Sequence, residues 1–202
     1  AADVTMFTEA DFMLDVAVAF LADEFNAYLQ RRTGSLALGR AVPGALVNDA
    51  GKVAVDKGTV GVALINIEEE RVTRVQQPER VLVNGREIVL PPELRLNLTL
   101  MFVPNMATYE LSLRALSHVL SFFQACPAFA VDEYPALDAR IGQLLVELHS
   151  IGPETLNQVW ACLGAKYMPS VLYRVRLVTL QDQEPAAIGA PITDISLAMK
   201  KK

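Results

Sequence analysis

The chain has 202 residues, of which 52% are hydrophobic and 20% are charged, and its formal net charge is −5. This length suits one well-buried domain, or one domain with a tail. The negative charge argues against general nucleic-acid binding, which needs a basic face. The surplus of apolar residues suggests that partner proteins cover part of the surface.

The sequence shows neither a membrane span nor a secretory signal. The apolar run from Val16 to Ala22 lies between Asp15 and Asp23, and it is far shorter than the roughly 20 residues that cross a bilayer. The residues before it are acidic where a signal peptide carries basic residues. We therefore expect a soluble protein that contacts no membrane.

The two cysteines bear on the cellular compartment of the protein. Cys126 and Cys162 both stand in apolar sequence. Buried free thiols in a reducing cytoplasm are the favoured interpretation, and a disulfide between the two is the alternative.

The first predicted element is a helix over residues 11–32, after a lead-in of residues 1–10. Apolar residues recur there at helical spacing, at Leu14, Val18, Leu21, Phe25 and Tyr28. Arg31 and Arg32 suit the end of a helix, and Gly34 follows as a stop.

Strands are expected next. Residues 34–58 hold five glycines and predict one or two strand fragments joined by turns, as a mobile connection. Thr59–Ile67 is apolar on both faces, which predicts a central strand covered on both sides or by a neighbouring subunit. Asn84-Gly85 between two β-favouring runs predicts a hairpin over residues 81–90.

Residues 95–103 alternate, with leucines and Phe102 on one face and Asn97 and Thr99 on the other. A second helix is predicted from Thr108 to Gln124, with an apolar stripe of Leu113, Leu116, Leu120 and Phe123.

The last predicted unit is a strand, a helix and a strand. Leu144, Val146 and Leu148 indicate the first strand, and Pro153 and Gly164 suit the two ends of the helix. The helix face consists of Leu156, Val159, Trp160 and Leu163, and we expect Trp160 to anchor a core. The last strand covers residues 170–180.

These elements predict an α/β or α+β fold in which a single mixed β-sheet has about three helices packed on it. We expect one domain over residues 11–180. Residues 181–202 contain two prolines, a short apolar patch and three lysines, and they are interpreted as a C-terminal arm. The alternative for this segment is a disordered linker.

The sequence offers no set of catalytic residues, so we expect no enzyme, no cofactor and no metal site. The two histidines, His118 and His149, have no second ligand at metal-binding spacing. Phosphate-binding, dinucleotide-binding and nucleophile-elbow motifs do not occur.

Candidate interface residues remain. Glu68, Glu69 and Glu70 are interpreted as a solvated strand end or as a docking patch for a basic partner; catalysis is the weakest reading, because adjacent strand residues point to opposite faces. Arg174 and Arg176 share a face, which costs stability unless carboxylates from elsewhere pair with them. They form either an interface pair or a solvated face.

Lys166 and Tyr167 lie in the loop after the last helix, where Tyr167 serves an interface or closes the edge of the core. In the tail, apolar Ile192, Ile195 and Leu197 are candidates for docking on a partner.

Several of these segments together resemble a known family. The ordered pattern is carried by Leu156-Asn157, Trp160, Leu163 to Tyr167, Pro169 to Tyr173 and Val175-Arg176, with Phe20-Leu21, Asn26 to Leu29 and Asn66 to Glu70 before it. It resembles the N-terminal domain of the cap, or tail-terminator, proteins of extracellular contractile injection systems of the antifeeding-prophage and Photorhabdus virulence cassette type. The resemblance spans roughly residues 12 to 180.

This resemblance implies a fold like that of phage tail terminators and a structural role, closing the distal end of the tube and sheath of a phage-tail-like particle. It implies a homo-hexameric ring with the sheath protein and the inner tube protein as partners. It also implies assembly in the cytoplasm, followed by a place in a particle that can be released outside the cell. The alternatives are an adaptor ring between tube and cap in a related particle, and a small-molecule-binding α/β domain.

Overall fold

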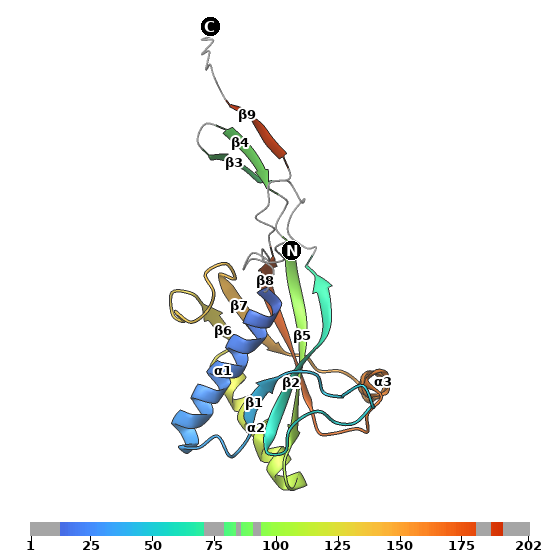
Figure 1. Cartoon of the computed structure of the whole chain (residues 1–202). Coiled ribbons are helices and arrows are strands. Elements are labelled where there is room, and N and C mark those ends of the chain that lie inside the picture. Colours follow the sequence, from blue (N-terminus) through green and yellow to red (C-terminus); the bar gives the residue numbers. More distant parts are fainter. Residues whose placement is uncertain (1–12, 71–78, 84–85, 91–93, 181–186, 192–202) are drawn as a thin grey trace, which may run out of the picture.

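The computed structural model describes residues 13–70, 79–83, 86–90, 94–180 and 187–191, with side chains for residues 13–70 and 94–176 (Figure 1). In chain order the elements are α1 (Met13–Thr33), β1 (Arg40–Pro43), β2 (Thr59–Glu69), β3 (Glu79–Val83), β4 (Arg86–Leu90), β5 (Leu94–Asn105), α2 (Tyr109–Ala125), β6 (Ala128–Ala130), β7 (Gln143–Leu148), α3 (Pro153–Leu163), β8 (Val171–Leu180) and β9 (Ala187–Pro191).

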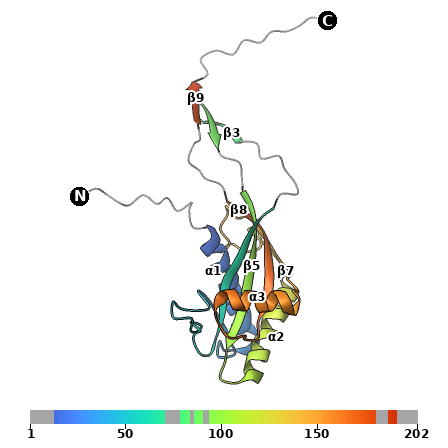
Figure 2. The same cartoon turned by 90° about the vertical axis from the view of Figure 1, so that its right-hand side faces the viewer.

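Six strands form one mixed sheet in the order β1-β2-β5-β8-β7-β6. β1 runs parallel to β2, and the other neighbouring strands of this sheet are antiparallel. Helices α1 and α2 lie on one face of the sheet and α3 lies on the other (Figures 1 and 2). For the described residues, this confirms the expected mixed sheet with helices packed on it.

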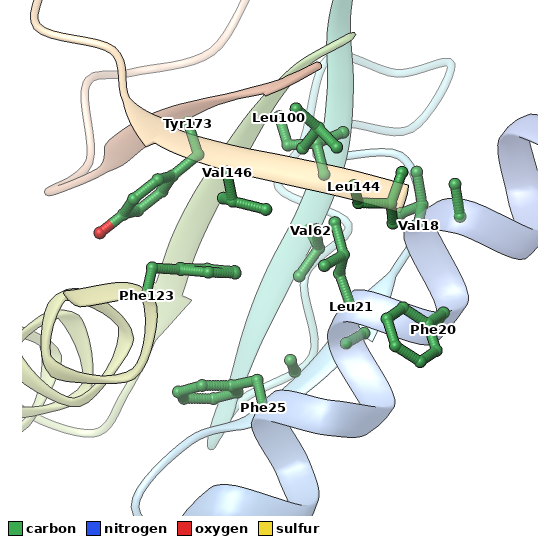
Figure 3. Packing of buried hydrophobic residues seen from close by; sticks show 14 of the residues in the cluster. Val18, Phe20, Leu21, Phe25, Val62, Leu100, Phe123, Leu144, Val146 and Tyr173 are labelled. Atoms are coloured by element: carbon green, nitrogen blue, oxygen red, sulfur yellow. The ribbon is translucent and has the colours of Figure 1, made fainter. Parts of the chain in front are cut away.

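The main core lies between the sheet and helices α1 and α2, as Figure 3 shows. Aromatic rings fill much of it: the ring centroid of Phe122 lies 5.7 Å from that of Phe25 and 6.0 Å from that of Phe129. Phe123 and Tyr173 join α2 to β8, with their centroids 4.5 Å apart. Such aromatic pairs contribute roughly 0.5–1.5 kcal/mol each beyond the area they bury.

Helix α1 forms where the spacing of apolar residues predicted it, and its buried face is wider than the predicted stripe. Ala17, Phe20 and Leu29 are buried there together with Val18, Leu21 and Phe25. The helix also supplies hydrogen bonds to the main chain of Ala41 in the edge strand β1. The side chain of Asn26 donates from Nδ2 to the carbonyl of Ala41 (3.0 Å) and accepts from the Ala41 N–H through Oδ1 (2.7 Å).

Two strands are buried differently from the predictions. β2 is buried on both faces only from Val60 to Ala63, and farther along Leu64 and Ile67 are 37% and 44% exposed. β5 was expected to have a polar face, but Asn97 and Thr99 are only 9% and 6% exposed. The reason is that β5 lies inside the sheet, between β2 and β8, where side chains from both neighbours cover it.

Helix α2 begins as predicted, with Thr108 as its cap: the Leu111 N–H donates to the Thr108 hydroxyl oxygen at 3.3 Å. The predicted apolar stripe is wrong for Leu113 and Leu120, which are 42% and 40% exposed, whereas Phe123 is buried as predicted. The buried face instead consists of Ser112, Ala115, Val119, Phe122 and Phe123.

A close approach explains the choice of face on α2. A Cβ atom placed on Gly39, just before β1, would lie 3.1 Å from the Cβ of Ala115, and Gly39 has a φ of 125°. Only small residues fit where the chain passes this near to the helix. A leucine at position 115 would not fit there, which favours burial of the face that carries Ala115.

The last unit follows the sequence signals. β7, α3 and β8 occupy the predicted positions, with Pro153 in the first turn of α3. Gly164 ends the helix in the left-handed conformation, at a φ of 67°. Trp160 is 3% exposed, which confirms that it is a core residue.

A second sheet has the order β3-β4-β9 and is antiparallel throughout. Its hairpin, β3 and β4, confirms the prediction from Asn84-Gly85, although the two turn residues lie outside the described residues. The strand β9 falls within the segment expected to be an arm, and it was not predicted. Figures 1 and 2 show this sheet beyond the ends of β2 and β8, apart from the helices.

Candidate interaction surface

One half of the sheet face that carries α3 is covered by this helix and by residues 44–58. The cluster beneath them contains the buried residues Leu46, Val55, Ala63, Met101, Val103, Trp160 and Leu172. Figure 2 shows α3 lying across the sheet here. This half of the face is a small second core and presents few sheet residues to solvent.

Residues 44–58 are held by a turn at Asn48. Its side-chain oxygen accepts hydrogen bonds from the N–H groups of Ala50 and Lys52, each at 3.0 Å. The turn lets Val55 reach β2, where a Cβ on Gly61 would lie only 2.5 Å from Cγ2 of Val55. Glycine at position 61 therefore allows the loop to pack directly on the strand.

The other half of the same face carries charged side chains from three strands. Arg174 on β8 lies 3.5 Å from Glu68 on β2. Nη2 of Arg176, also on β8, lies 3.7 Å from Oε2 of Glu70, the residue that follows β2, and its Nη1 lies 3.3 Å from Oε1 of Glu147 on β7. We call these five residues the charged network. Exposed pairs of this kind contribute about 0–1 kcal/mol each, so the network is not a main source of stability.

The network encloses polar atoms that have no hydrogen-bond partner among the described residues. Asn97 on β5 donates from Nδ2 to Glu70 at 2.8 Å, whereas its Oδ1 is buried without a donor. Nε of Arg174 is likewise buried without an acceptor. A buried polar atom left without a partner costs about 1–3 kcal/mol, so water or a neighbouring chain would be stabilising here.

The structure therefore brings together two sets of candidate residues that were predicted separately from the sequence, the glutamates after Ile67 and the two arginines of β8. The carboxylates that Arg174 and Arg176 required come from Glu68, Glu70 and Glu147. Glu69 is paired in register with Leu96, a core residue, and so points to the opposite face. The strand order, with β5 between β2 and β8, makes these contacts possible.

The loop after α3 projects outward. Tyr167 is 63% exposed, and its ring meets the edge of Trp160 with the centroids 6.0 Å apart. Lys166 beside it is exposed. Tyr167 thus touches the second core without being part of it, and the interface role of both residues stays a prediction. Ile192, Ile195 and Leu197 lie outside the described residues.

Several exposed apolar side chains were missed from the sequence. Tyr109, Leu113 and Leu120 on α2 are 69%, 42% and 40% exposed. Leu148 at the end of β7 is 54% exposed. The signal available on α2 was the small residue Ala115, which lies on the face that comes close to Gly39.

The titratable groups with shifted pKa values lie away from this surface. Burial raises the pKa of Tyr173 to about 12. Burial, and then the charge of Arg32, lowers the pKa of His118. Hydrogen bonds from Arg140 hold the pKa of Asp138 at about 2. Each shift has a structural cause.

The cysteines correct one expectation. Both are free, but Cys162 on α3 is exposed and Cys126 is only partly buried. Within the described ranges no three His, Cys, Asp or Glu side chains are grouped so that they could hold a metal ion. A search of the same ranges found no helix with the length and apolar character needed to span a membrane.

Comparison with known proteins identifies the fold and the family. The sequence of residues 17–194 matches the family described as the Pvc16 N-terminal domain. The chain belongs to this family. Comparison with curated proteins gave no significant sequence match.

Two solved structures have a similar fold. One is the sheath/tube terminator of an extracellular contractile injection system, PVC, in its extended state: the TM-score is 0.60 at 13% identity, over 98% of this chain and 65% of that one. The other is the cap of the anti-feeding prophage, described as its tube terminating cap: the TM-score is 0.54 at 15% identity, over 90% of this chain and 61% of that one. The chain thus spans less than two thirds of the length of either protein, and at these identities the likeness concerns the fold.

Proposed function

We propose that this Pvc16 N-terminal domain chain is part of a structural cap, or tail terminator, that closes the distal end of the tube and sheath of a contractile injection particle. The observation that carries the proposal is the match of residues 17–194 to the family. The fold supports it, because the two similar structures are named as a sheath/tube terminator and a tube terminating cap. The role is structural and involves no catalysis.

A terminator has to meet the unused contacts of the last ring of a polymer while it offers none to the next incoming subunit. Rigid surfaces suit this task. The six-stranded sheet with helices on both faces supplies such a frame, and the charged network and the Lys166–Tyr167 loop lie on its surface.

The finer parts of the proposal concern assembly. We propose a homo-hexameric ring that contacts the sheath protein and the inner tube protein, with assembly in the cytoplasm before the particle is complete. The exposed apolar residues on α2 and on the second half of β2 support contacts with other chains, since such residues are candidates for burial in an assembly.

Deletion of this protein in the producing strain tests the cap role. We expect negative-stain images to show sheaths of uncontrolled length or unstable particles, and complementation with the full gene to restore normal ones. Particles of normal length and stability in the deletion strain would refute the cap role.

Light scattering in the presence of sheath or tube protein tests the ring. A strictly monomeric mass alongside these partners would count against a hexamer. The isolated chain is not the test, because the ring can require the particle as a template.

A further inference from the structure

The second half of β2 has an open edge. β1 pairs with β2 only as far as Val62, through Pro43. Proline has no N–H and cannot continue the ladder. From Leu64 to Glu69, the described part of the chain places no strand beside β2 on the side away from β5 (Figure 1).

This open edge also carries exposed aliphatic side chains. Leu64 and Ile67 are 37% and 44% exposed, whereas their register partners Leu100 and Leu98 on β5 are fully buried. The register is irregular between Leu64 and Asn66 and regular from there to Glu69. An edge with unpaired main-chain groups beside half-exposed aliphatic residues is a template for an added strand.

We propose that residues 192–202 of a second copy of this chain add to this edge as a strand parallel to β2. The inference rests on the proposed function, which brings copies together in a ring. Both segments have the same order of chemistry. Along β2 and the residue after it, Leu64 and Ile67 are followed by three glutamates, and in residues 192–202 Ile195, Leu197 and Met199 are followed by three lysines.

Charge favours this partner. The side chain of Glu68 is 46% exposed even with Arg174 beside it. Among the side chains that the structure describes at this end of the sheet, the four carboxylates of Glu68, Glu69, Glu70 and Glu147 outnumber the three guanidinium groups of Arg95, Arg174 and Arg176. Within this described set the excess charge is negative, and three consecutive lysines complement it.

The order of the charges requires a parallel strand, and a parallel strand requires a second copy. In a parallel alignment the aliphatic residues meet Leu64 and Ile67 while the lysines meet the glutamates. β2 runs toward the β3-β4-β9 sheet (Figure 1), and residue 192 directly follows β9. If residues 192–202 turned back along β2 of the same chain, they would run antiparallel to β2. The lysines would then lie beside Leu64. β1 already pairs with this edge of β2 in the parallel direction. The added strand would therefore continue along the same edge, in the same direction, where β1 ends.

Hydrogen exchange of the full chain, followed by NMR, tests the proposal with a synthetic peptide of residues 192–202 in excess. The peptide makes the test independent of ring formation. We expect exchange to slow about tenfold or more at alternate amides between Asn66 and Glu69, because only alternate N–H groups point toward an added strand. Amides of Leu98 and Leu100 on β5 are already inside the sheet and serve as the internal control.

A matched peptide with Lys200, Lys201 and Lys202 replaced by glutamate provides the second control, and it should protect these amides much less. A paramagnetic tag placed after Lys202 should broaden the signals of Glu69 and Glu70, whereas a tag before Ile192 should act at the Val62 end. No protection on β2, equal protection by both peptides, or the reverse pattern of broadening would each overturn the proposal. The particle phenotype of the deletion strain would be unaffected by such a result, so failure of this inference is distinct from failure of the cap role.

Discussion

Nδ2 of Asn97 donates to Oε2 of Glu70 at 2.8 Å, and the same carboxylate oxygen lies 3.7 Å from Nη2 of Arg176. Asn97 on the central strand β5 thereby positions the carboxylate of Glu70, which directly follows β2, toward the guanidinium group of Arg176 on β8. The side chain of Glu70 is 14% exposed, against 55% for Glu147, the other carboxylate beside Arg176. Water can therefore replace the carboxylate of Glu70 less easily than that of Glu147, so loss of Glu70 should cost more stability.

Glu70→Gln removes this charge and keeps an amide oxygen for Asn97. We expect it to lower the free energy of unfolding by about 1–2 kcal/mol, because the partly buried hydrogen bond from Asn97 then ends on a neutral oxygen and the ion pair with Arg176 is lost. Glu147→Gln is the matched control and should cost about 0.5 kcal/mol or less, as an exposed ion pair does. Urea denaturation measures both. Equal costs for the two substitutions would contradict the ranking by burial.

Gly61→Ala should be destabilising by about 1–3 kcal/mol, because overpacking displaces a well-packed neighbour. The added Cβ would lie 2.5 Å from Cγ2 of Val55. Gly44→Ala is the control, since nothing lies within 4 Å of a Cβ at that position. Thermal unfolding compares the two variants. The double substitution Gly61→Ala with Val55→Ala should recover part of the loss, and an unperturbed single variant would show that the loop is not packed as described.

The elements that the sequence predicted well are those with local signals. Helix α3 has a proline at its start, a left-handed glycine after its end and four apolar residues on one face, so its bounds follow from neighbouring residues alone. The β3–β4 hairpin was likewise predictable from Asn84-Gly85. The short strands β6 and β9 carry no such signal, and they exist only through pairing with β7 and β4.

The contacts that define the candidate surface depend on strand order instead. Arg174 and Glu68 were both candidates, but their pairing requires β5 to lie between β8 and β2, which no local pattern specifies. The same limit applies to α2. Leu113 and Leu120 form a good helical stripe, but the buried face is the one on which Ala115 lies close to Gly39 and Phe122 and Phe123 pack in the core.

Trp160→Ala should lower the free energy of unfolding by about 3–5 kcal/mol, the usual cost of truncating a buried tryptophan. Trp160 is 3% exposed in the second core, whereas its ring neighbour Tyr167 is 63% exposed. Tyr167→Ala should therefore change stability by about 0.5 kcal/mol or less. Melting followed by circular dichroism separates the two. A Trp160→Ala variant with an unchanged melting temperature that fails to assemble would mean that Trp160 serves an interface.

Acid stability should depend on Asp138. Its pKa is held at about 2, below the ordinary 3.8, by hydrogen bonds from the Arg140 side chain and N–H. As the pH falls from about 4 to about 2, the unfolded chain takes up a proton at this position before the folded chain does, so this contribution to stability is present above that window and lost within it. Asp138→Asn should flatten the dependence of the unfolding free energy on pH over this window. Identical slopes for the two proteins, measured by urea denaturation at several pH values, would show that the pair contributes nothing.

Two truncations separate the roles of β9 and of the residues after it. Ending the chain after Pro191 keeps β9 paired with β4, whereas ending it after Leu180 leaves β3 and β4 as a two-stranded hairpin, which is marginal alone. Both truncated chains should retain the melting temperature of the six-stranded domain, because its core lies within residues 13–176. Both should be incorporated less into purified particles, as measured by immunoblotting against a tube protein standard. A defect only after removal of β9 would assign assembly to the β3-β4-β9 sheet. Full incorporation of both chains would reject an arm altogether and leave the loops and sheet faces of the domain as the docking surfaces.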